Sequence, residues 1–247
     1  MTQPVQRIAV AAAVAVAAAV AFCACVLDTT RSDAAKPVVF YASQSGESTL
    51  DQGEGGGNPF ASALIELLER PSLTYAELQS ELPALTKAKS RGFQAPDIPT
   101  EVASNQWRVK PVPASARRVA LVFVYSDYPN AELTSLPGAE RDLERVAAGL
   151  RMAGFEVRTA ANPTGADLLK ALETLARSSE DAEAAVVYLT GHGFEHDGQV
   201  YLMPNDYPFG EGPDRLPDCA VHVAGLVRYL KSNSANIVFF GGCRTYW

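Results

Sequence analysis

Apolar runs and amphipathic stripes alternate along most of the chain, and this alternation predicts an α/β fold. Strands are expected at the short apolar runs, which are residues 37–42, 119–125, 155–159, 184–190, 199–203 and 236–240. Helices are expected where apolar residues recur at helical spacing, which is after the Asn58-Pro59 pair and over residues 74–82, 137–153, 164–177 and 220–230. Strands that alternate with helices predict a mainly parallel sheet with helices on both faces.

Two stretches show neither the apolar run of a strand nor apolar residues at helical spacing, and we expect them to be connections. Residues 83–116 carry prolines at positions 83, 96, 99, 111 and 113, which predicts an extended segment with one strand near Trp107. Residues 45–57 are rich in glycine but lack the Gly-Lys-Ser/Thr ending of a phosphate-binding loop. We therefore expect a flexible loop there that borders a groove.

The first 35 residues differ from the rest of the chain. Residues 8–27 form an unbroken apolar run after a head that carries one positive charge, at Arg7. This pattern predicts an N-terminal apolar helix, with residues 1–35 as a signal peptide or a membrane anchor and the remainder of the chain outside the inner membrane. Residues 22–25 resemble a bacterial lipoprotein cleavage box, with Cys25 as the lipidated residue. The expected location is the periplasmic side of the bacterial cell envelope, or alternatively the outside of the cell after secretion.

Composition excludes one class of partner. The 247 residues are 47% hydrophobic, which is ordinary for a globular protein with one core or two small ones. The formal net charge is −7 and the pI is about 5.1. Because this acidic chain has no basic stripe, we expect no nucleic acid partner.

Two residues with catalytic chemistry follow predicted strands. His192 lies between two glycines after the strand at 184–190, and Cys243 follows two glycines after the strand at 236–240. Sites in open α/β sheets gather outside the carboxyl ends of the strands, so both side chains should emerge at one edge. A neutral imidazole can take the proton of a thiol, and the thiolate can attack a carbonyl carbon. The backbone N–H groups of Gly193 and Cys243 could then donate to the oxyanion that forms.

Other interpretations of these residues remain open. In an oxidising compartment Cys243 could instead pair with Cys219 as a disulfide. His192, His196 and Asp197 could imitate a metal site, but ligands four residues apart act together on a helix, and this segment is predicted to be a loop. We therefore expect no metal site, and we expect His222, in a helical pattern, to be a surface or boundary residue.

The block from Arg117 to Arg244 resembles the caspase and metacaspase clan of cysteine peptidases. The matching motifs occur in the family's order, at residues 119–124, 127–129, 136–142, 154–157, 190–193, 197–206 and 242–244. Residues 38–68 and 94–96 resemble a segment that follows the cysteine in bacterial members of the clan. The resemblance therefore implies a circularly permuted caspase-like fold. A truncated relic of a tandem array is the competing explanation.

A permutation implies a particular division of the chain. Residues 36–116 would be the small-subunit-like part with its proline-rich linker, and residues 117–247 the large-subunit-like part with the histidine and the cysteine. Residues 36–247 together would then form one caspase-like domain. New chain ends of this kind are tolerated in exposed loops, because the termini of a domain often lie close together.

The resemblance also implies an activity and its residues. Cys243 would be the nucleophile of a cysteine endopeptidase, His192 the base and acid, and the Gly193 and Cys243 N–H groups the oxyanion hole. Ser43, Gln44 and Asp142 would bind a peptide or protein substrate. Gly241 departs from the family, because many members have an aspartate there that helps to bind a basic side chain. No cofactor is required for the chemistry, although calcium is possible by analogy with metacaspases. One alternative is a catalytically silent pseudo-enzyme that binds a peptide or protein partner, and another is a non-peptidase α/β hydrolase.

Overall fold

The computed structural model of the protein describes residues 35–53, 55–99, 107–129 and 133–247. The predicted apolar helix and the predicted lipidation site at Cys25 lie outside these residues. Among the helices in the described ranges, none is both long and apolar enough to cross a bilayer. The described residues all belong to one compact unit, Asp33–Trp247.

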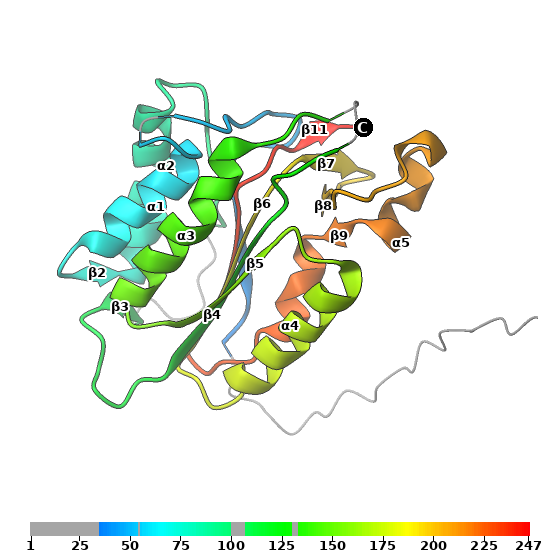
Figure 1. Cartoon of the computed structure of the whole chain (residues 1–247). Helices are drawn as coiled ribbons and strands as arrows, with labels where there is room; N and C mark the ends of the chain where they lie inside the picture. The colour runs from blue at the N-terminus through cyan, green and yellow to red at the C-terminus, as the bar shows by residue number, and fades with distance from the viewer. Residues whose placement is uncertain (1–34, 54, 100–106, 130–132) are drawn as a thin grey trace, which may run out of the picture. The chain divides into compact units, whose positions relative to one another are not determined.

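A central sheet of five parallel strands organises this unit (Figure 1). Its strands, in spatial order, are β1 (Val38–Tyr41), β10 (Ala235–Phe240), β6 (Ala184–Thr190), β4 (Arg118–Val124) and β5 (Glu156–Ala161). Every residue of β4, β6 and β10 is buried, as expected of parallel strands that are covered on both faces. The predicted mainly parallel sheet is confirmed.

Helices cover both faces of this sheet, as predicted. Alternate residues of β4 point to opposite faces: Ala120 and Val122 join one buried apolar cluster, and Leu121 and Phe123 join the other. The first cluster includes residues of α1 (Pro59–Glu69), α2 (Tyr75–Lys89) and α3 (Pro137–Met152). The second includes residues of α4 (Gly165–Ser179) and of the 3₁₀ helix η3 (Ala224–Tyr229). Figure 1 shows α1, α2 and α3 on one side of the sheet and α4 on the other.

Local capping explains why three of these helices begin where the sequence predicts. The Asn58 side chain accepts a hydrogen bond from the Phe60 N–H, and Pro59 occupies the first helical position. Thr74 forms a capping box with Glu77, and the Thr164 hydroxyl accepts from the Asp167 N–H. Each cap satisfies a backbone N–H that has no partner inside its helix.

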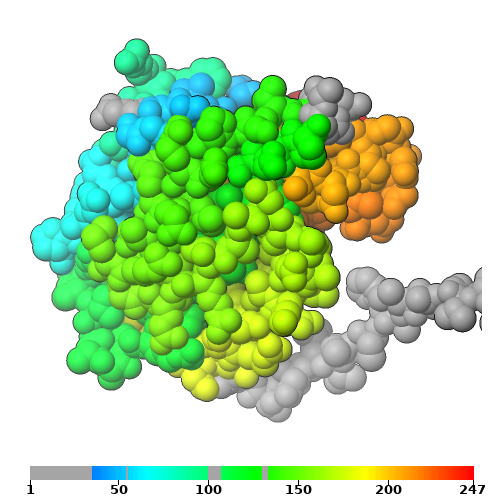
Figure 2. All heavy atoms as spheres, viewed as in Figure 1, coloured from blue at the N-terminus to red at the C-terminus, as the bar shows by residue number. Residues whose placement is uncertain are grey.

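Smaller elements complete the described fold. A four-stranded sheet has the order β11 (Thr245–Tyr246), β7 (Gly193–His196), β8 (Gln199–Leu202) and β9 (Val221–His222). A two-stranded sheet joins β2 (Leu73–Thr74) to β3 (Arg108–Lys110), so a strand does lie beside Trp107 as predicted. Three short helices lie between β8 and β9, namely η1 (Phe209–Glu211), η2 (Pro213–Arg215) and α5 (Leu216–Cys219). The orange atoms of this last region stand at one side of the space-filling view (Figure 2).

Helix α2 is longer than the sequence predicts. We expected an extended chain from residue 83, but α2 continues through Pro83 to Lys89. A proline inside a helix costs a hydrogen bond and causes a clash with the preceding turn. The last turns offset that cost with tertiary contacts, because Leu82 and Thr86 are fully buried and Lys89 pairs with Glu66 of α1 at 2.7 Å.

Two segments around the smaller sheet also differ from the prediction. Residues 220–230 do not form an α-helix, because Val221 and His222 pair with β8 and only a 3₁₀ helix follows them. The burial of Val223, Leu226 and Leu230 produces the helical spacing that misled the prediction. Residues 193–196 are not a loop but β7, paired antiparallel with β8.

Candidate active site

The ends of β6 and β10 bring the His192 and Cys243 segments together. Phe240 pairs with Leu189 in parallel register, and the Gly241 N–H donates to the Leu189 carbonyl at 2.8 Å. Just beyond, Gly193 packs against the Cys243 backbone so closely that a Cβ at Gly193 would lie 2.3 Å from the Cys243 carbonyl oxygen. The segments that carry the predicted base and nucleophile are therefore side by side at the carboxyl edge of the sheet.

The Cys243 thiol is half-buried and is held by the loop that follows β1. The Thr49 N–H donates to Cys243 Sγ at 3.2 Å, and Thr49 Oγ1 lies 3.4 Å from the same sulfur. Cys243 and Cys219 are both free thiols, so the disulfide alternative does not hold in this structure. The Cys219 sulfur accepts a hydrogen bond from Arg215 Nη2 at 3.3 Å.

The His192 ring is oriented by groups from two other segments. Its Nε2 lies 2.7 Å from the Thr134 carbonyl oxygen, which can only accept, so the Nε2–H tautomer is assigned and Nδ1 is left as the basic nitrogen. The Tyr128 ring packs edge-on against the imidazole at 4.7 Å, and the Tyr128 hydroxyl accepts from the His192 N–H at 3.1 Å. Burial lowers the pKa of His192 below its ordinary value of 6.5. No hydrogen bond joins this ring to Cys243 Sγ, both of which lie among the described residues.

Asp142, predicted to bind substrate, is fully buried and already has partners. Its Oδ2 accepts from the Asn58 N–H at 2.8 Å, and its Oδ1 accepts from Arg145 Nη1 at 2.6 Å. Burial raises the pKa of the Asp142 carboxyl to about 7, against the lowering effect of the Asn58 N–H and of Arg145.

The two other residues predicted to bind substrate follow β1 at the same edge of the sheet. Ser43 is buried, and its hydroxyl donates to the Glu47 carbonyl at 3.2 Å. The Gln44 side chain is exposed, and its Nε2 donates to the Pro96 carbonyl at 2.9 Å. The backbone of this segment is tied to the cysteine segment, because the Gly46 N–H donates to the Arg244 carbonyl and the Arg244 N–H to the Glu47 carbonyl, each at 2.9 Å.

Arg244 connects three parts of the chain directly after the cysteine. Its Nε donates to Glu195 Oε2 at 3.1 Å and its Nη1 to Asp97 Oδ2 at 2.7 Å. Its guanidinium also lies over the Tyr41 ring at 4.4 Å. The buried Arg244–Glu195 pair joins β7 to the segment that carries Cys243, and the contact with Tyr41 joins the end of β1 to it.

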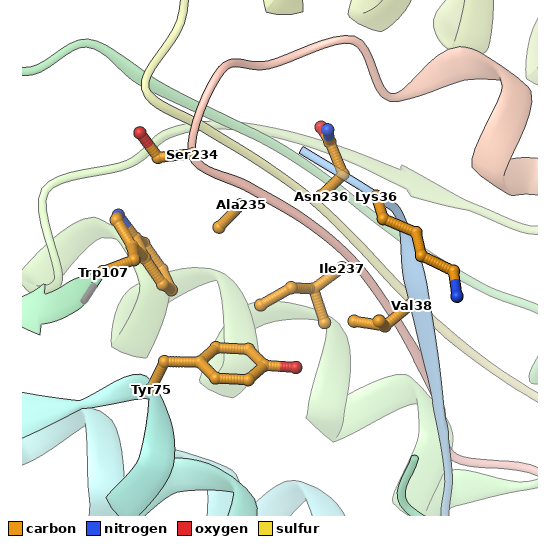
Figure 3. Close-up of a pocket in the computed structure, with 8 residues that line it drawn as sticks. All are labelled: Lys36, Val38, Tyr75, Trp107, Ser234, Ala235, Asn236 and Ile237. Atoms are coloured by element: carbon orange, nitrogen blue, oxygen red, sulfur yellow. The ribbon is translucent and has the colours of Figure 1, made fainter. Parts of the chain in front are cut away.

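Two other features of the described structure concern metal binding and ligand binding. Within the described ranges, no group of three or more His, Cys, Asp or Glu side chains could hold a metal ion, and His196 lies 3.6 Å from the Asp197 carboxylate as a pair. Figure 3 shows a small hollow lined by Tyr75, Trp107, Ile237 and five other residues. Because Ala235 at the start of β10 lines it, this hollow lies at the end of the strand opposite to Cys243.

Three residues of the site, Thr49, Thr134 and Arg145, were not predicted from the sequence. Thr49 and Thr134 contact the thiol and the imidazole from loops, and no periodic pattern marks them. Arg145 left a usable signal, because it lies three residues after Asp142 on a predicted helix, where opposite charges meet.

Unfolding should depend on the Asp142 carboxyl between about pH 5 and pH 7. In this range the folded protein retains the proton, because the carboxyl pKa is about 7 in the fold against an ordinary 3.8. A pKa raised by folding stabilises the protein at low pH, and this stabilisation is lost as the pH rises towards 7. Relative to an Asp142→Asn variant, the free energy of unfolding should fall by about 1.4 kcal/mol per pH unit. Urea denaturation of both proteins at several pH values measures this, and a constant difference between them would refute it.

Comparison with known proteins supplies one family match. A family model described as the caspase domain matches residues 117–244, which is just over half of the 247 residues. A comparison with curated proteins gives no match. Among solved structures, the chain is similar to the Drosophila initiator caspase Dronc, with 19% sequence identity and a TM-score of 0.36. That similarity covers 51% of this chain and 48% of the Dronc chain.

Proposed function

Because this chain belongs to the caspase-domain family of cysteine peptidases, we propose that it is an endopeptidase that uses Cys243 as nucleophile and His192 as base and acid. A peptidase domain implies a peptide or protein substrate. The observation that carries the proposal is the parallel register of β6 and β10, which puts the segments bearing the two residues side by side.

The proposed reaction passes through a thioester. Nδ1 of His192 takes the proton of the Cys243 thiol, and the thiolate attacks the carbonyl carbon of the peptide bond. The tetrahedral intermediate expels the amine, which takes its proton from the imidazolium. Water, deprotonated by the same imidazole, then attacks the thioester, releases the carboxylic acid product and restores the thiol. The hydrogen bond from Nε2–H to Thr134 supports these steps, because it keeps Nδ1 available as the base.

The developing oxyanion needs donors at the same place. We propose that the N–H groups of Gly193 and Cys243 supply them. The close packing of Gly193 on the Cys243 carbonyl supports this, since any side chain at position 193 would come too near. Before attack the thiol must exchange its contact with Thr49 for one with the imidazole. Catalytic hydrogen bonds often tighten only in the substrate complex, so we propose that substrate displaces Thr49 from the sulfur.

We further propose that the domain is a circular permutation of the family arrangement, with residues 36–116 and 117–247 as its two parts. The parallel pairing of β1 with β10, from Val38 opposite Ile237 to Tyr41 opposite Phe240, supports this proposal. The loop after β1 then reaches the nucleophile through Thr49, and Ser43 and Gln44 would bind the substrate backbone beside it. Residues 1–35 keep their proposed role of exporting the chain or anchoring it in the bacterial envelope.

A peptide-library digestion tests the function. The full chain is incubated with a diverse peptide mixture, with and without calcium, and new termini are identified by mass spectrometry. We expect cleavages by the wild-type chain that are absent with the Cys243→Ala variant. The calcium arm tests the cofactor that the resemblance allows, and no step above depends on that ion. Identical products from both chains would refute the proposal.

The dependence of the rate on pH should reveal His192. Because burial lowers the pKa of the imidazole, kcat/KM should fall towards acid pH with an apparent pKa below 6.5. The neutral imidazole that accepts the thiol proton is then present at neutral pH. A rate profile measured between about pH 4 and pH 8 checks this, and a half-maximal point above 6.5 would contradict it.

A pseudo-enzyme that binds peptides is the second candidate function. The specific observation in its favour is that the Cys243 sulfur is hydrogen-bonded to Thr49 and not to His192. Such a protein would bind peptides at the same edge without cleaving them. Equal affinity of the wild-type and Cys243→Ala chains for a peptide that neither cleaves would support this candidate.

A further inference from the structure

The buried Asp142 carboxylate is connected to the nucleophile segment through one residue. The Asn58 N–H donates to Asp142 Oδ2, and the Asn58 side-chain Nδ2 donates to the Gly241 carbonyl at 2.8 Å. Gly241 is two residues before Cys243. Asp142 therefore lies behind the backbone next to the nucleophile, and a substrate residue attacked by Cys243 would have its side chain close to this backbone. We call that substrate residue the acyl residue.

An arginine of the protein itself already binds this carboxylate. Arg145, one turn further along α3, donates from Nη1 to Asp142 Oδ1 at 2.6 Å and from Nη2 to Ser62 Oγ at 3.0 Å. Both groups of the Asp142–Arg145 pair are thus held from within the protein. Above about pH 7, where the Asp142 carboxyl is ionised, the pair carries one negative and one positive charge, so it presents no net charge to a substrate.

Gly55 and Gly57 lie against this pair. A Cβ at Gly57 would lie 1.9 Å from Asp142 Oδ1 and 2.2 Å from Arg145 Nη1, and one at Gly55 would lie 3.1 Å from Arg145 Nη2. Such close approach of backbone is possible only for glycine. With Asp142 fully buried, a substrate guanidinium has no access to Oδ1 while Arg145 is in place.

Gly241 lies against two hydroxyl groups. A Cβ at Gly241 would lie 2.9 Å from both Thr190 Oγ1 and the Tyr188 hydroxyl. Tyr188 is fully buried, and no described residue forms a hydrogen bond of ordinary geometry with its hydroxyl, although the Thr190 hydroxyl interacts with it. An unpaired hydroxyl group in a dry interior is costly, and a neutral polar group of a ligand could satisfy it.

From these contacts we propose that Arg145 sets the specificity of the site by neutralising Asp142, so that the acyl residue is uncharged and not arginine or lysine. The proposal rests on the proposed function, which supplies the substrate whose acyl residue is selected. Arg145 acts through Asp142 and is a positioning residue, whereas a purely structural role would leave the acyl-residue preference unchanged.

The test compares the full wild-type chain with Arg145→Gln and the charge-retaining Arg145→Lys. Each is given, at a pH above the Asp142 pKa of about 7, matched fluorogenic peptides whose acyl residue is alanine, threonine, arginine or lysine. We expect the wild type and Arg145→Lys to cleave the uncharged peptides at least about tenfold faster than the basic ones, since a buried unpaired charge is strongly disfavoured. Arg145→Gln should raise the ratio of basic to uncharged kcat/KM at least about tenfold, and adding Asp142→Asn to it should remove that gain. Thermal melting confirms that each variant is folded.

A binding measurement separates failure of this inference from failure of the proposed function. The Cys243→Ala chain, with and without Arg145→Gln, is titrated with the same peptides by fluorescence anisotropy. The same shift towards basic peptides in binding, without hydrolysis by the wild type, would support the role of Arg145 and refute the peptidase. A wild-type preference for arginine or lysine, or the same preference in folded Arg145→Gln as in the wild type, would overturn the role of Arg145. Absence of binding to every peptide would overturn it as well.

Discussion

Replacing Cys243 with alanine is expected to abolish peptide-bond hydrolysis, and replacing His192 with alanine to lower kcat/KM by about 10²- to 10⁴-fold. Alanine at position 243 removes the only atom that forms the thioester, so no residual covalent route exists. Alanine at position 192 leaves the thiol but removes the group that accepts its proton and later protonates the amine. Initial rates on a peptide identified in the library digestion measure both effects.

The matched control is Cys219→Ala. This residue is also a free thiol, but it lies on α5, beside Arg215 and away from the ends of β6 and β10. The control variant should retain wild-type activity. If Cys219→Ala abolished hydrolysis while Cys243→Ala retained it, the assignment of the nucleophile would be wrong.

Replacing Arg244 with alanine should destabilise the fold by about 3–5 kcal/mol, the usual cost of breaking a buried ion pair. The Glu195 side chain is only 8% exposed, and without Arg244 it would keep the hydrogen bond from the Ser45 hydroxyl to Oε1 at 2.8 Å but lose its positive partner. The loss would also release Asp97 and the Tyr41 ring from the segment that carries Cys243. Urea denaturation gives the change in the free energy of unfolding.

The control for this effect is an ion pair near the surface. Arg70 and Glu81 are joined at 2.7 Å, with side chains 34% and 41% exposed. Water screens such a pair, so Arg70→Ala should cost about 1 kcal/mol or less. Equal losses in the two variants would show that Arg244 does not hold the site together.

The fold was predictable wherever local patterns and tertiary packing agree. The buried strands β4, β6 and β10 are continuous apolar runs, and Asn58, Thr74 and Thr164 mark the starts of helices by their capping chemistry. The prediction was wrong where contacts between residues far apart in the sequence determine the local structure. Burial of Thr86 carries α2 through Pro83, and pairing with β8 makes Val221 and His222 a strand.

The candidate site likewise contains some residues that could be predicted from the sequence and others that could not. The positions of His192 and Cys243 after buried strands follow from hydrophobic pattern, and the parallel register then places their segments at one edge. Their immediate partners, Thr134 and Thr49, belong to irregular loops whose path depends on the finished fold. The Asp142–Arg145 pair is intermediate, because the spacing on α3 indicates the contact but only the fold shows that it is buried.

The most direct measurement is the rate at which iodoacetamide alkylates each cysteine of the full folded chain, followed by mass spectrometry of the peptides. Cys219 is a stringent reference, because the Arg215 guanidinium lies against its sulfur. We predict that Cys243 reacts at least about tenfold faster than Cys219 and that His192→Ala removes this advantage. If Cys243 reacts no faster than Cys219, or reacts equally fast without His192, then the proposed catalytic pair does not exist.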